Sequence, residues 1–189
     1  EIVKFLREKL VVPADRCYAQ TSPLDTGCLF KLAGRISGDG SHNAMFYPPA
    51  KPMQAPAGYD LYTEVRKHDV LLAYPYQSIR PFIRMLLRAA ADPDVVSIKM
   101  TLYRMASDSQ IVNALIAAAE NGKEVVAMVE LRARFDEQNN IDWSKQLEDA
   151  GCTVFYGFDD YKVHSKLTLI TSRKDGKYKY LTQIGTGNY

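Results

Sequence analysis

The sequence predicts an α/β fold whose sheet is mixed and parallel at its centre. Short apolar, β-branched segments alternate with helical patterns from about residue 70 to residue 156, as in strands joined by crossover helices. The last two predicted strands, 165–171 and 178–184, are separated only by Lys174-Asp175-Gly176-Lys177, a hairpin turn signal. A hairpin joins antiparallel strands, so the sheet must contain both strand directions.

The start of the chain follows a different pattern. Apolar residues recur at helical spacing in residues 1–10, and a shorter apolar run extends from Thr26 to Leu32. Proline and glycine are dense in residues 38–58, which indicates an irregular connector. We therefore expect residues 1–50 to be a partial helical and irregular segment, the tail of a preceding domain with its connector. Residues 51–189 would form the main domain.

The main domain is expected to hold a series of strands and helices in alternation. In order, these are a strand over 70–74 closed by Pro75, a helix over 79–91 capped by Ser78, a strand over 95–103, a helix from Asp108 or Ser109 to Asn121-Gly122, a strand over 124–131, a helix over 142–150, a strand over 152–156 and the final hairpin. The strand over 124–131 is nearly all apolar, which is typical of a strand buried on both faces of a sheet.

Composition excludes several classes of protein. A hydrophobic content of 47% suits a packed core, and a net charge of +2 does not predict a nucleic-acid partner. No apolar run approaches membrane-spanning length, and residues 1–4 do not resemble a signal peptide. The three cysteines form no Cys-x-x-Cys pair, which favours reduced thiols in the cytoplasm. Because the chain has no initiator Met, we expect it to be a piece of a longer protein.

The most informative stretch is Val163-His164-Ser165-Lys166, which precedes an apolar strand pattern. His164 and Lys166 are two residues apart, so on a strand both side chains would point to one face. A neutral imidazole can attack phosphorus, and an ammonium can neutralise the phosphoryl oxygens. Further along, Gly185-Thr186-Gly187-Asn188 would let backbone N–H groups approach an anion, with Asn188 as a side-chain donor.

Basic residues follow two of the predicted strands. Arg104 comes after the strand over 95–103, and Arg134 follows the strand over 124–131. Ligands of such sheets gather at the carboxyl ends of the strands. His164 lies at the amino end of its strand, so the three residues meet at one edge only if that strand is antiparallel to its neighbours. Together with Lys166 they would then form a phosphate cradle.

Other polar residues have plainer interpretations. His42 and His68 are expected on the surface, and the basic stripe of Arg80, Arg84 and Arg88 is expected to be a solvated helix face, with guidance of a polyanion as the alternative. Acidic residues in the predicted loops could hold a divalent ion through water, although such pairs are common; they are Asp136, Glu137, Asp159 and Asp160.

Several motifs from about residue 58 to the end resemble one known family, the polyphosphate kinases of the first family. They are Tyr74-Pro75-Tyr76, Ala89-Ala90-Ala91-Asp92-Pro93, Thr101-Leu102-Tyr103-Arg104, Ala118-Ala119-Glu120-Asn121-Gly122-Lys123, Val129-Glu130-Leu131 with Ala133-Arg134-Phe135-Asp136-Glu137, Asn140-Ile141, His164-Ser165-Lys166 and Gly185-Thr186-Gly187-Asn188-Tyr189. Before residue 58 the resemblance is fainter.

The resemblance implies a phospholipase-D-like domain, the first of two carboxyl-terminal domains, with the helices flanking a mixed sheet. It also implies reversible transfer of the ATP γ-phosphate to inorganic polyphosphate through a phosphohistidine. His164 matches the phosphorylated histidine, and Arg104 and Arg134 match two arginines of a magnesium–phosphate site. Because arginine has no free acceptor, both would bind phosphate oxygens that Mg²⁺ also contacts. Lys166 would stabilise the transferring phosphoryl group.

The resemblance further implies a cytoplasmic protein, with membrane association of the full-length form as the alternative, that is a homo-oligomer and binds ATP or ADP. Two alternatives stay open. A phosphodiesterase of the same fold is disfavoured by Thr171, which stands where phospholipase D enzymes carry an aspartate five positions after the lysine. A polyanion-binding module would use the same basic residues without phosphorylating His164. We expect the isolated chain to be inactive, since a second histidine motif and most nucleotide contacts of the family lie beyond residue 189.

Overall fold

The computed structural model describes residues 1–21, 25–38, 47, 50–131, 137–158 and 160–188. The chain divides into two units, Glu1–Ala50 and Lys51–Tyr189. The first unit contains α1 (Ile2–Leu10), the 3-10 helix η1 (Ala14–Arg16) and α2 (Cys28–Gly38). That this unit is the tail of a preceding domain stays a prediction. Within the described ranges, no helix is both long and apolar enough to cross a membrane.

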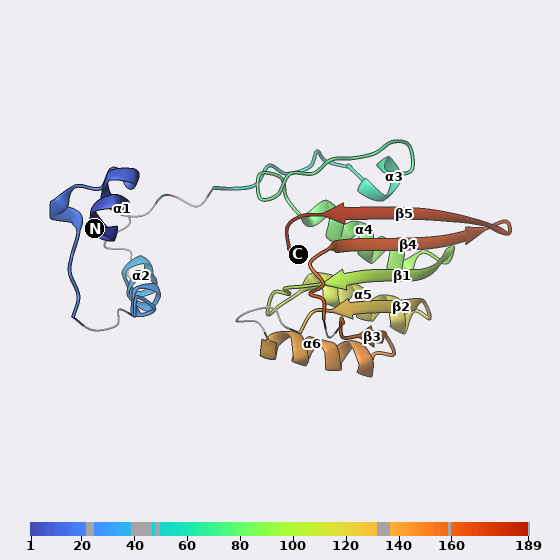
Figure 1. Ribbon diagram of the computed structural model, residues 1–189. Helices are drawn as coiled ribbons and strands as arrows, with labels where there is room; N and C mark the ends of the chain where they lie inside the picture. The colour runs from blue at the N-terminus through green and yellow to red at the C-terminus, as the bar shows by residue number, and fades with distance from the viewer. Residues whose placement is uncertain (22–24, 39–46, 48–49, 132–136, 159, 189) are drawn as a thin grey trace. The chain divides into compact units, whose positions relative to one another are not determined.

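The second unit is built on a five-stranded sheet with the strand order β3-β2-β1-β4-β5 (Figure 1). The strands are β1 (Val95–Leu102), β2 (Glu124–Val129), β3 (Thr153–Phe155), β4 (Lys166–Lys174) and β5 (Lys177–Gly185). β1 is parallel to β2 and β2 to β3, whereas β4 is antiparallel to both β1 and β5. The predicted mixed sheet is therefore confirmed, but its parallel strands β3, β2 and β1 form one side of the sheet, and the central strand β1 has an antiparallel neighbour in β4.

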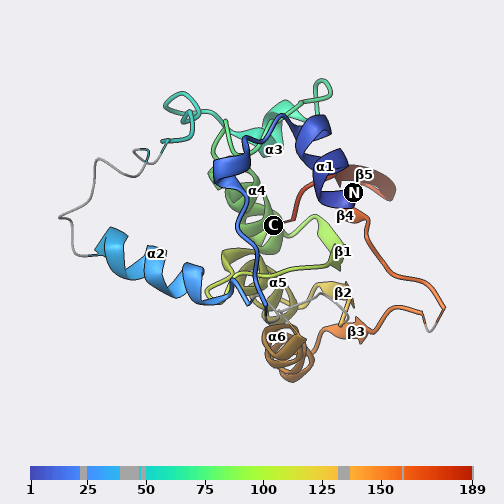
Figure 2. The ribbon, with the colours of Figure 1, turned by 60° about the vertical axis from the view of Figure 1, so that its left-hand side comes forward.

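Helices cover one face of this sheet (Figure 2). After the short α3 (Leu61–Glu64) come α4 (Arg80–Ala91), α5 (Gln110–Glu120) and α6 (Glu137–Asp149). α5 connects β1 to β2 and α6 connects β2 to β3, and right-handed crossovers in one direction place both helices on the same face. The Ser109 side chain caps α5 by accepting a hydrogen bond of 3.3 Å from the Val112 N–H, as the sequence predicts.

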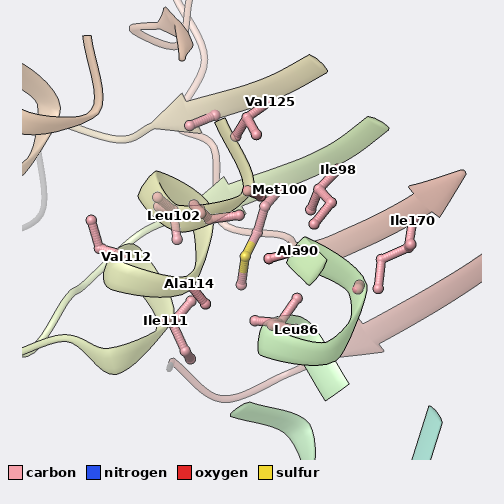
Figure 3. Close-up of a cluster of buried hydrophobic side chains, with 14 of the residues drawn as sticks. Leu86, Ala90, Ile98, Met100, Leu102, Ile111, Val112, Ala114, Val125 and Ile170 are labelled. Atoms are coloured by element: carbon pink, nitrogen blue, oxygen red, sulfur yellow. The ribbon is translucent and has the colours of Figure 1, made fainter. Parts of the chain in front are cut away.

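The core lies between the sheet and these helices. Alternate residues of β1 and β2 point into it, including Ile98, Met100 and Val125, and Leu86 of α4 packs against them (Figure 3). This alternation reflects the two-residue period of a strand. The other face of the sheet is more open: Lys99 and Glu124 form an ion pair of 3.1 Å on it.

Three predicted details of the elements are wrong. β2 is buried on its helix side only, and its other face is exposed or half-buried, because no helix of the described residues covers it. α6 begins at Glu137, five residues earlier than predicted. On α4, the helical spacing predicts Leu87 on the apolar face, but this residue is 45% exposed, and Met85 and Ala89 are buried instead.

The strand predicted over 70–74 is also absent. Val70 and Leu72 are half-buried against the core, but Leu71 is 91% exposed and the segment joins no strand of the sheet. Its hydrogen bonds are local: the Ala73 N–H donates to Gln77 Oε1 at 2.7 Å, and the Gln77 N–H donates to the Ala73 carbonyl at 2.8 Å. A turn therefore satisfies backbone groups that a strand would have paired in a ladder.

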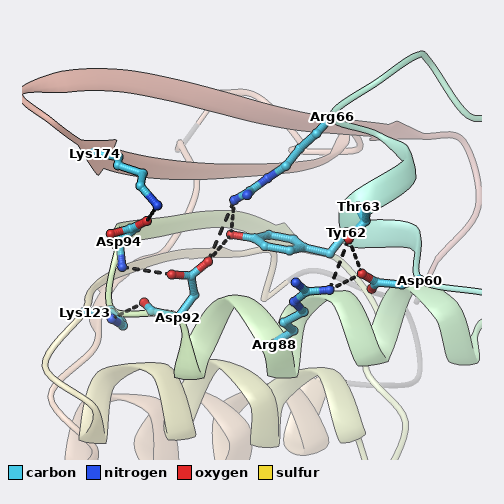
Figure 4. A network of polar contacts seen from close by, with 9 residues as sticks. All are labelled: Asp60, Tyr62, Thr63, Arg66, Arg88, Asp92, Asp94, Lys123 and Lys174. Atoms are coloured by element: carbon cyan, nitrogen blue, oxygen red, sulfur yellow. Dashed lines mark hydrogen bonds and ion pairs between the residues drawn. The ribbon is translucent and has the colours of Figure 1, made fainter.

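A polar network closes the end of the sheet at which β1 begins (Figure 4). The Tyr62 hydroxyl donates a hydrogen bond of 2.9 Å to Asp92 and accepts one of 2.7 Å from Arg66. Lys123 Nζ donates to the Asp92 carbonyl at 2.6 Å. Arg88 binds Asp60, so this member of the predicted basic stripe is not simply a solvated residue. The network ties α3 and α4 to the start of β1.

Candidate functional site

Arg104, His164 and Lys166 lie at the opposite edge of the sheet, where β1 ends at Leu102 and β2 ends at Val129. β4 runs antiparallel to β1, so its first residue, Lys166, lies at this same edge. The sequence analysis required the strand after His164 to be antiparallel to its neighbours, and β4 is antiparallel to both β1 and β5.

His164 and Lys166 lie in different environments. β4 begins at Lys166, so the expectation that both residues belong to one strand is wrong for His164. The His164 side chain is exposed, whereas Lys166 is 1% exposed and points to the helix-covered face, as Thr168 and Ile170 do. Lys166 Nζ donates a hydrogen bond of 2.6 Å to the His164 carbonyl. An accessible imidazole thus lies next to an almost fully buried ammonium.

Tyr103 joins these two residues. Its ring meets the His164 ring edge to face, with 5.0 Å between centroids and 72° between planes. Lys166 Nζ lies 4.5 Å from the centroid of the same ring, and Lys162 Nζ lies 5.5 Å from it. Both distances are within the range of cation–π attraction. The Tyr103 ring therefore contacts both the imidazole and the Lys166 ammonium.

Burial lowers the pKa of Lys166 from its ordinary value of 10.5, because the charged form loses hydration, while Tyr103 acts in the opposite direction. The hydrogen bond to the His164 carbonyl and the face of the Tyr103 ring replace part of the lost water. A buried ammonium at the edge of a sheet is suited to binding an anion that approaches His164.

Of the two predicted phosphate-binding arginines, only Arg104 belongs to the residues that the structure describes. Arg104 follows Tyr103 directly beyond the end of β1 and is half-buried, with its Nε atom buried. Arg134 lies outside the described residues, and so its place at the site stays a prediction.

Asn188 is exposed shortly after β5. Gly185 pairs with Lys166 across the two strands, and a Cβ atom there would lie 3.6 Å from the Lys166 Cβ. Phosphate binding by Asn188 also stays a prediction.

A groove of about 620 Å³ lies beside the imidazole. It is lined by Met128, Phe158, Tyr161, Lys162, Val163, His164 and Ser165. Met128 belongs to the open face of β2, and the other residues belong to the segment that leads into β4. The exposed imidazole therefore faces a space that can hold part of a substrate.

Asparagine side chains of α6 fix the loop that carries Tyr103. Asn140 is fully buried, and its Nδ2 donates to the Tyr103 carbonyl at 2.9 Å and to the Glu130 carbonyl at 3.0 Å. Asn139 Nδ2 donates to the Met105 carbonyl at 2.7 Å. One buried amide thus connects the residues that follow β1 and β2, which sets the spacing of this edge.

The described residues do not fit direct coordination of a metal ion. No group of three or more His, Cys, Asp or Glu side chains within the described ranges is placed to bind one. The basic and aromatic side chains around His164 offer no ligand set for Mg²⁺, and the one carboxylate among the contacts there, that of Glu130, accepts from the Val163 N–H. Of the acidic loop residues considered above, Asp136 and Asp159 lie outside the described residues.

Sequence reasoning missed the roles of Tyr103 and Asn140. Tyr103 was noted only as a neighbour of Arg104, although an aromatic residue directly after a strand that ends beside a lysine was an available signal. Asn140 is a polar residue on the buried face of α6. The predicted helix began at residue 142, after Asn140, so the pattern did not place this residue on a helix face. Recognising it required the true start of α6.

Comparison with known proteins identifies the relatives of this chain. Residues 60–189 match the family model described as polyphosphate kinase C-terminal domain 1. A polyphosphate kinase from Bacillus anthracis is 43% identical over 100% of this chain and 27% of its own length, and one from Pseudomonas aeruginosa is 40% identical with the same coverage. The crystal structure of polyphosphate kinase from Porphyromonas gingivalis matches with a TM-score of 0.62 and 35% identity over 78% of this chain and 25% of that chain.

The fold and its edge site define an α/β domain, a mixed sheet flanked by helices with a histidine and a lysine at the edge where its parallel strands end. The chain belongs to the polyphosphate kinase C-terminal domain 1 family. It spans about a quarter of the length of the curated relatives it matches.

Proposed function

We propose that this chain supplies the phosphoryl-accepting histidine of an enzyme that reversibly transfers the γ-phosphate of ATP to inorganic polyphosphate. The observation that carries the proposal is the exposed imidazole of His164 beside the buried ammonium of Lys166, at the edge where β1 and β2 end. The names of the relatives, polyphosphate kinase, support the same substrate class.

The reaction takes place in two transfers. In the first, a ring nitrogen of His164 attacks the γ-phosphorus, a P–N bond forms, the bond between the γ-phosphorus and the bridging oxygen breaks, and ADP leaves. In the second, a terminal oxygen of polyphosphate attacks the phosphorus, the P–N bond breaks, and the chain is one unit longer. Each step is an in-line displacement that accumulates charge on the equatorial oxygens.

The basic residues of the edge stabilise that charge. Lys166 lies closest to the His164 backbone, and its buried ammonium neutralises the transferring phosphoryl group. Arg104 and Arg134 bind phosphate oxygens, and Asn188 adds a neutral donor. Arg104 and Arg134 cannot ligate Mg²⁺ themselves and would hold it only through the phosphate oxygens that they bind, where the ion would neutralise phosphate charge.

The remaining parts of the proposal concern the full-length protein. The relatives are roughly four times longer than this chain, so nucleotide contacts from outside it are required and the isolated chain does not turn over. The protein is a cytoplasmic homo-oligomer with no nucleic-acid partner. ATP-dependent polyphosphate synthesis by the 189 residues alone would overturn the first of these statements.

The test uses the full-length protein that contains this sequence. The protein is incubated with γ-labelled ATP and Mg²⁺, and acid-labile, base-stable label is located by peptide mapping. Label on the peptide containing His164, absent from the His164→Ala variant, supports the proposal. Polyphosphate synthesis with label elsewhere or with no label contradicts it.

Assays of phosphodiester hydrolysis and of polyphosphate binding, run beside the labelling, separate the alternatives. A phosphodiesterase would hydrolyse a phosphatidyl or nucleic-acid substrate; Thr171, half-buried in β4 where that class carries an aspartate, argues against it. A polyanion-binding module would bind polyphosphate equally well after His164→Ala, and the wild-type protein would never take up label.

A further inference from the structure

The backbone around His164 is held by side chains on both sides of this residue. The Val163 N–H donates a hydrogen bond of 2.7 Å to Glu130 Oε2. The Ser165 carbonyl accepts a hydrogen bond of 2.7 Å from Thr101 Oγ1. The residue before His164 is therefore fixed from the end of β2 and the residue after it from β1, although His164 itself belongs to no strand.

Thr101 takes over where the pairing of β1 with β4 stops. The last paired residues of this ladder are Met100 and Thr168. Beyond them, the Thr101 hydroxyl donates to the Ser165 carbonyl and accepts a hydrogen bond of 2.8 Å from the Leu167 N–H. A hydroxyl can do both at once, whereas a side chain without one would lose both the hydrogen bond to the Ser165 carbonyl and the one from the Leu167 N–H.

Glu130, at the end of β2, holds the backbone on the other side of His164 through its hydrogen bond with Val163. This residue follows the strand directly and is 4% exposed. Its own backbone is fixed, because its N–H donates to the Leu102 carbonyl at 2.9 Å and its carbonyl accepts from Asn140. A carboxylate that accepts from a backbone N–H makes a stronger hydrogen bond than a neutral acceptor. The Val163 peptide is thus anchored to a rigid part of the sheet.

We propose that Thr101 and Glu130 are positioning residues for His164, holding its backbone so that the exposed imidazole keeps one orientation in front of the groove. This inference rests on the proposed function. A nucleophile on a segment outside the sheet would otherwise sample several positions, and a misplacement of about 1 Å can cost on the order of 100-fold in rate. Neither residue needs to touch the substrate.

The first test compares Thr101→Val with Thr101→Ser in the full-length protein. Valine keeps the β-branched shape that suits a strand but has no hydroxyl, whereas serine keeps the hydroxyl. In single-turnover labelling with γ-labelled ATP, Thr101→Val should phosphorylate His164 about tenfold more slowly at saturating ATP, with little change in the ATP concentration for half-maximal rate. Thr101→Ser should recover most of the rate.

Matched controls separate positioning from general damage to the sheet. Thr182→Val makes the same change on the exposed side of β5 and should label like the wild type. Glu130→Ala removes the acceptor for Val163 and should slow labelling, while Glu130→Gln keeps an acceptor oxygen and should slow it less.

The outcomes are distinct from those of the proposed function. If the wild-type protein takes up no label on His164, the proposed function fails. If the wild type is labelled on His164, and Thr101→Val and Glu130→Ala are both labelled at the wild-type rate, the inference is overturned. It is also overturned if these variants lose their rate only because they are unfolded at the assay temperature, as judged by circular dichroism.

Discussion

The ammonium nitrogen of Lys166 lies 4.5 Å from the centre of the Tyr103 ring. The ring belongs to the loop after β1 and the lysine is the first residue of β4, so the contact joins two strands at the edge that carries His164. The ring also meets the His164 imidazole edge to face. One aromatic side chain therefore sets the spacing between the proposed nucleophile and the proposed phosphate-binding cation.

This relationship gives the first prediction. Tyr103→Leu removes the ring and should lower the rate of His164 phosphorylation by about tenfold, since a cation–π contact of this kind is worth about 0.5–2 kcal/mol. Tyr103→Phe keeps the ring and should retain most of the rate. The measurement is single-turnover labelling of the full-length protein. Equal rates for the leucine and phenylalanine variants would show that the ring has no such role.

A second prediction concerns alkaline pH. Because burial lowers the pKa of Lys166, this residue loses its charge at a lower pH than an exposed lysine does. The rate of labelling should therefore fall as the pH rises through that lowered pKa. In Lys166→Arg the guanidinium keeps its charge well above the pH at which a lysine loses it, so the fall should move to higher pH whatever the absolute rate.

Lys162→Arg is the matched control, because Lys162 approaches the same ring but is exposed. The alkaline fall of its labelling rate should coincide with that of the wild type.

The pH dependence of stability independently checks that the pKa of Lys166 is lowered rather than raised. Between the lowered pKa and 10.5, the folded chain has released a proton that the unfolded chain still binds, so the free energy of unfolding should rise with pH in this window. Lys166→Met should remove that rise.

The residues at the ends of the strands could be predicted from the sequence, but whether β4 is antiparallel to β1 could not. Strand periodicity placed Arg104 after one strand and His164 before another, and the hairpin signal at Asp175-Gly176 set the direction of the last two strands. In the structure Asp175 and Gly176 both have positive φ, 51° and 74°, as a two-residue hairpin turn with a right-handed twist requires. Local sequence was sufficient here because the turn itself fixes the pairing.

Contacts between distant segments could not be predicted in the same way. Thr101 and Ser165 lie far apart in the sequence, and a threonine within a strand pattern carries no mark of a hydroxyl that replaces a ladder bond. The segment 70–74 shows the opposite error. Its apolar composition predicts a strand, but the side chain of Gln77 satisfies the backbone of Ala73, and this competition is not visible in the pattern.

The third prediction tests the packing of α4. Leu86 is fully buried between the helices and the sheet, whereas its neighbour Leu87 is 45% exposed. Leu86→Ala should lower the free energy of unfolding by about 2–5 kcal/mol, because it removes buried methyl groups and leaves a cavity. Leu87→Ala should cost less than about 1 kcal/mol. Urea unfolding of the two variants measures the difference, and equal losses would mean that α4 faces the core differently.

The last prediction concerns the polar network at the other end of the sheet. Burial alone would raise the pKa of Asp92, but hydrogen bonds from the Asp94 N–H and the Tyr62 hydroxyl, with the charge of Arg66, hold it below its ordinary value of 3.8. A lowered carboxylate pKa means that the stabilisation is complete above pH 3.8 and is lost as the pH falls through the lower, folded-state value.

Asp92→Asn should therefore lower the free energy of unfolding by about 1–3 kcal/mol at pH 7, since it weakens hydrogen bonds to a charged acceptor. The gap between the variant and the wild type should narrow as the pH falls below 3.8. Asp94→Asn is the matched control: its carboxylate pairs with Lys174 at 3.4 Å on a more exposed part of the surface, so its loss should be smaller. Urea titrations between pH 7 and pH 3 measure both differences. A gap for Asp92→Asn that stays constant across this range would mean that its charge does not stabilise the start of β1, and that the hydrogen bonds of the network act without it.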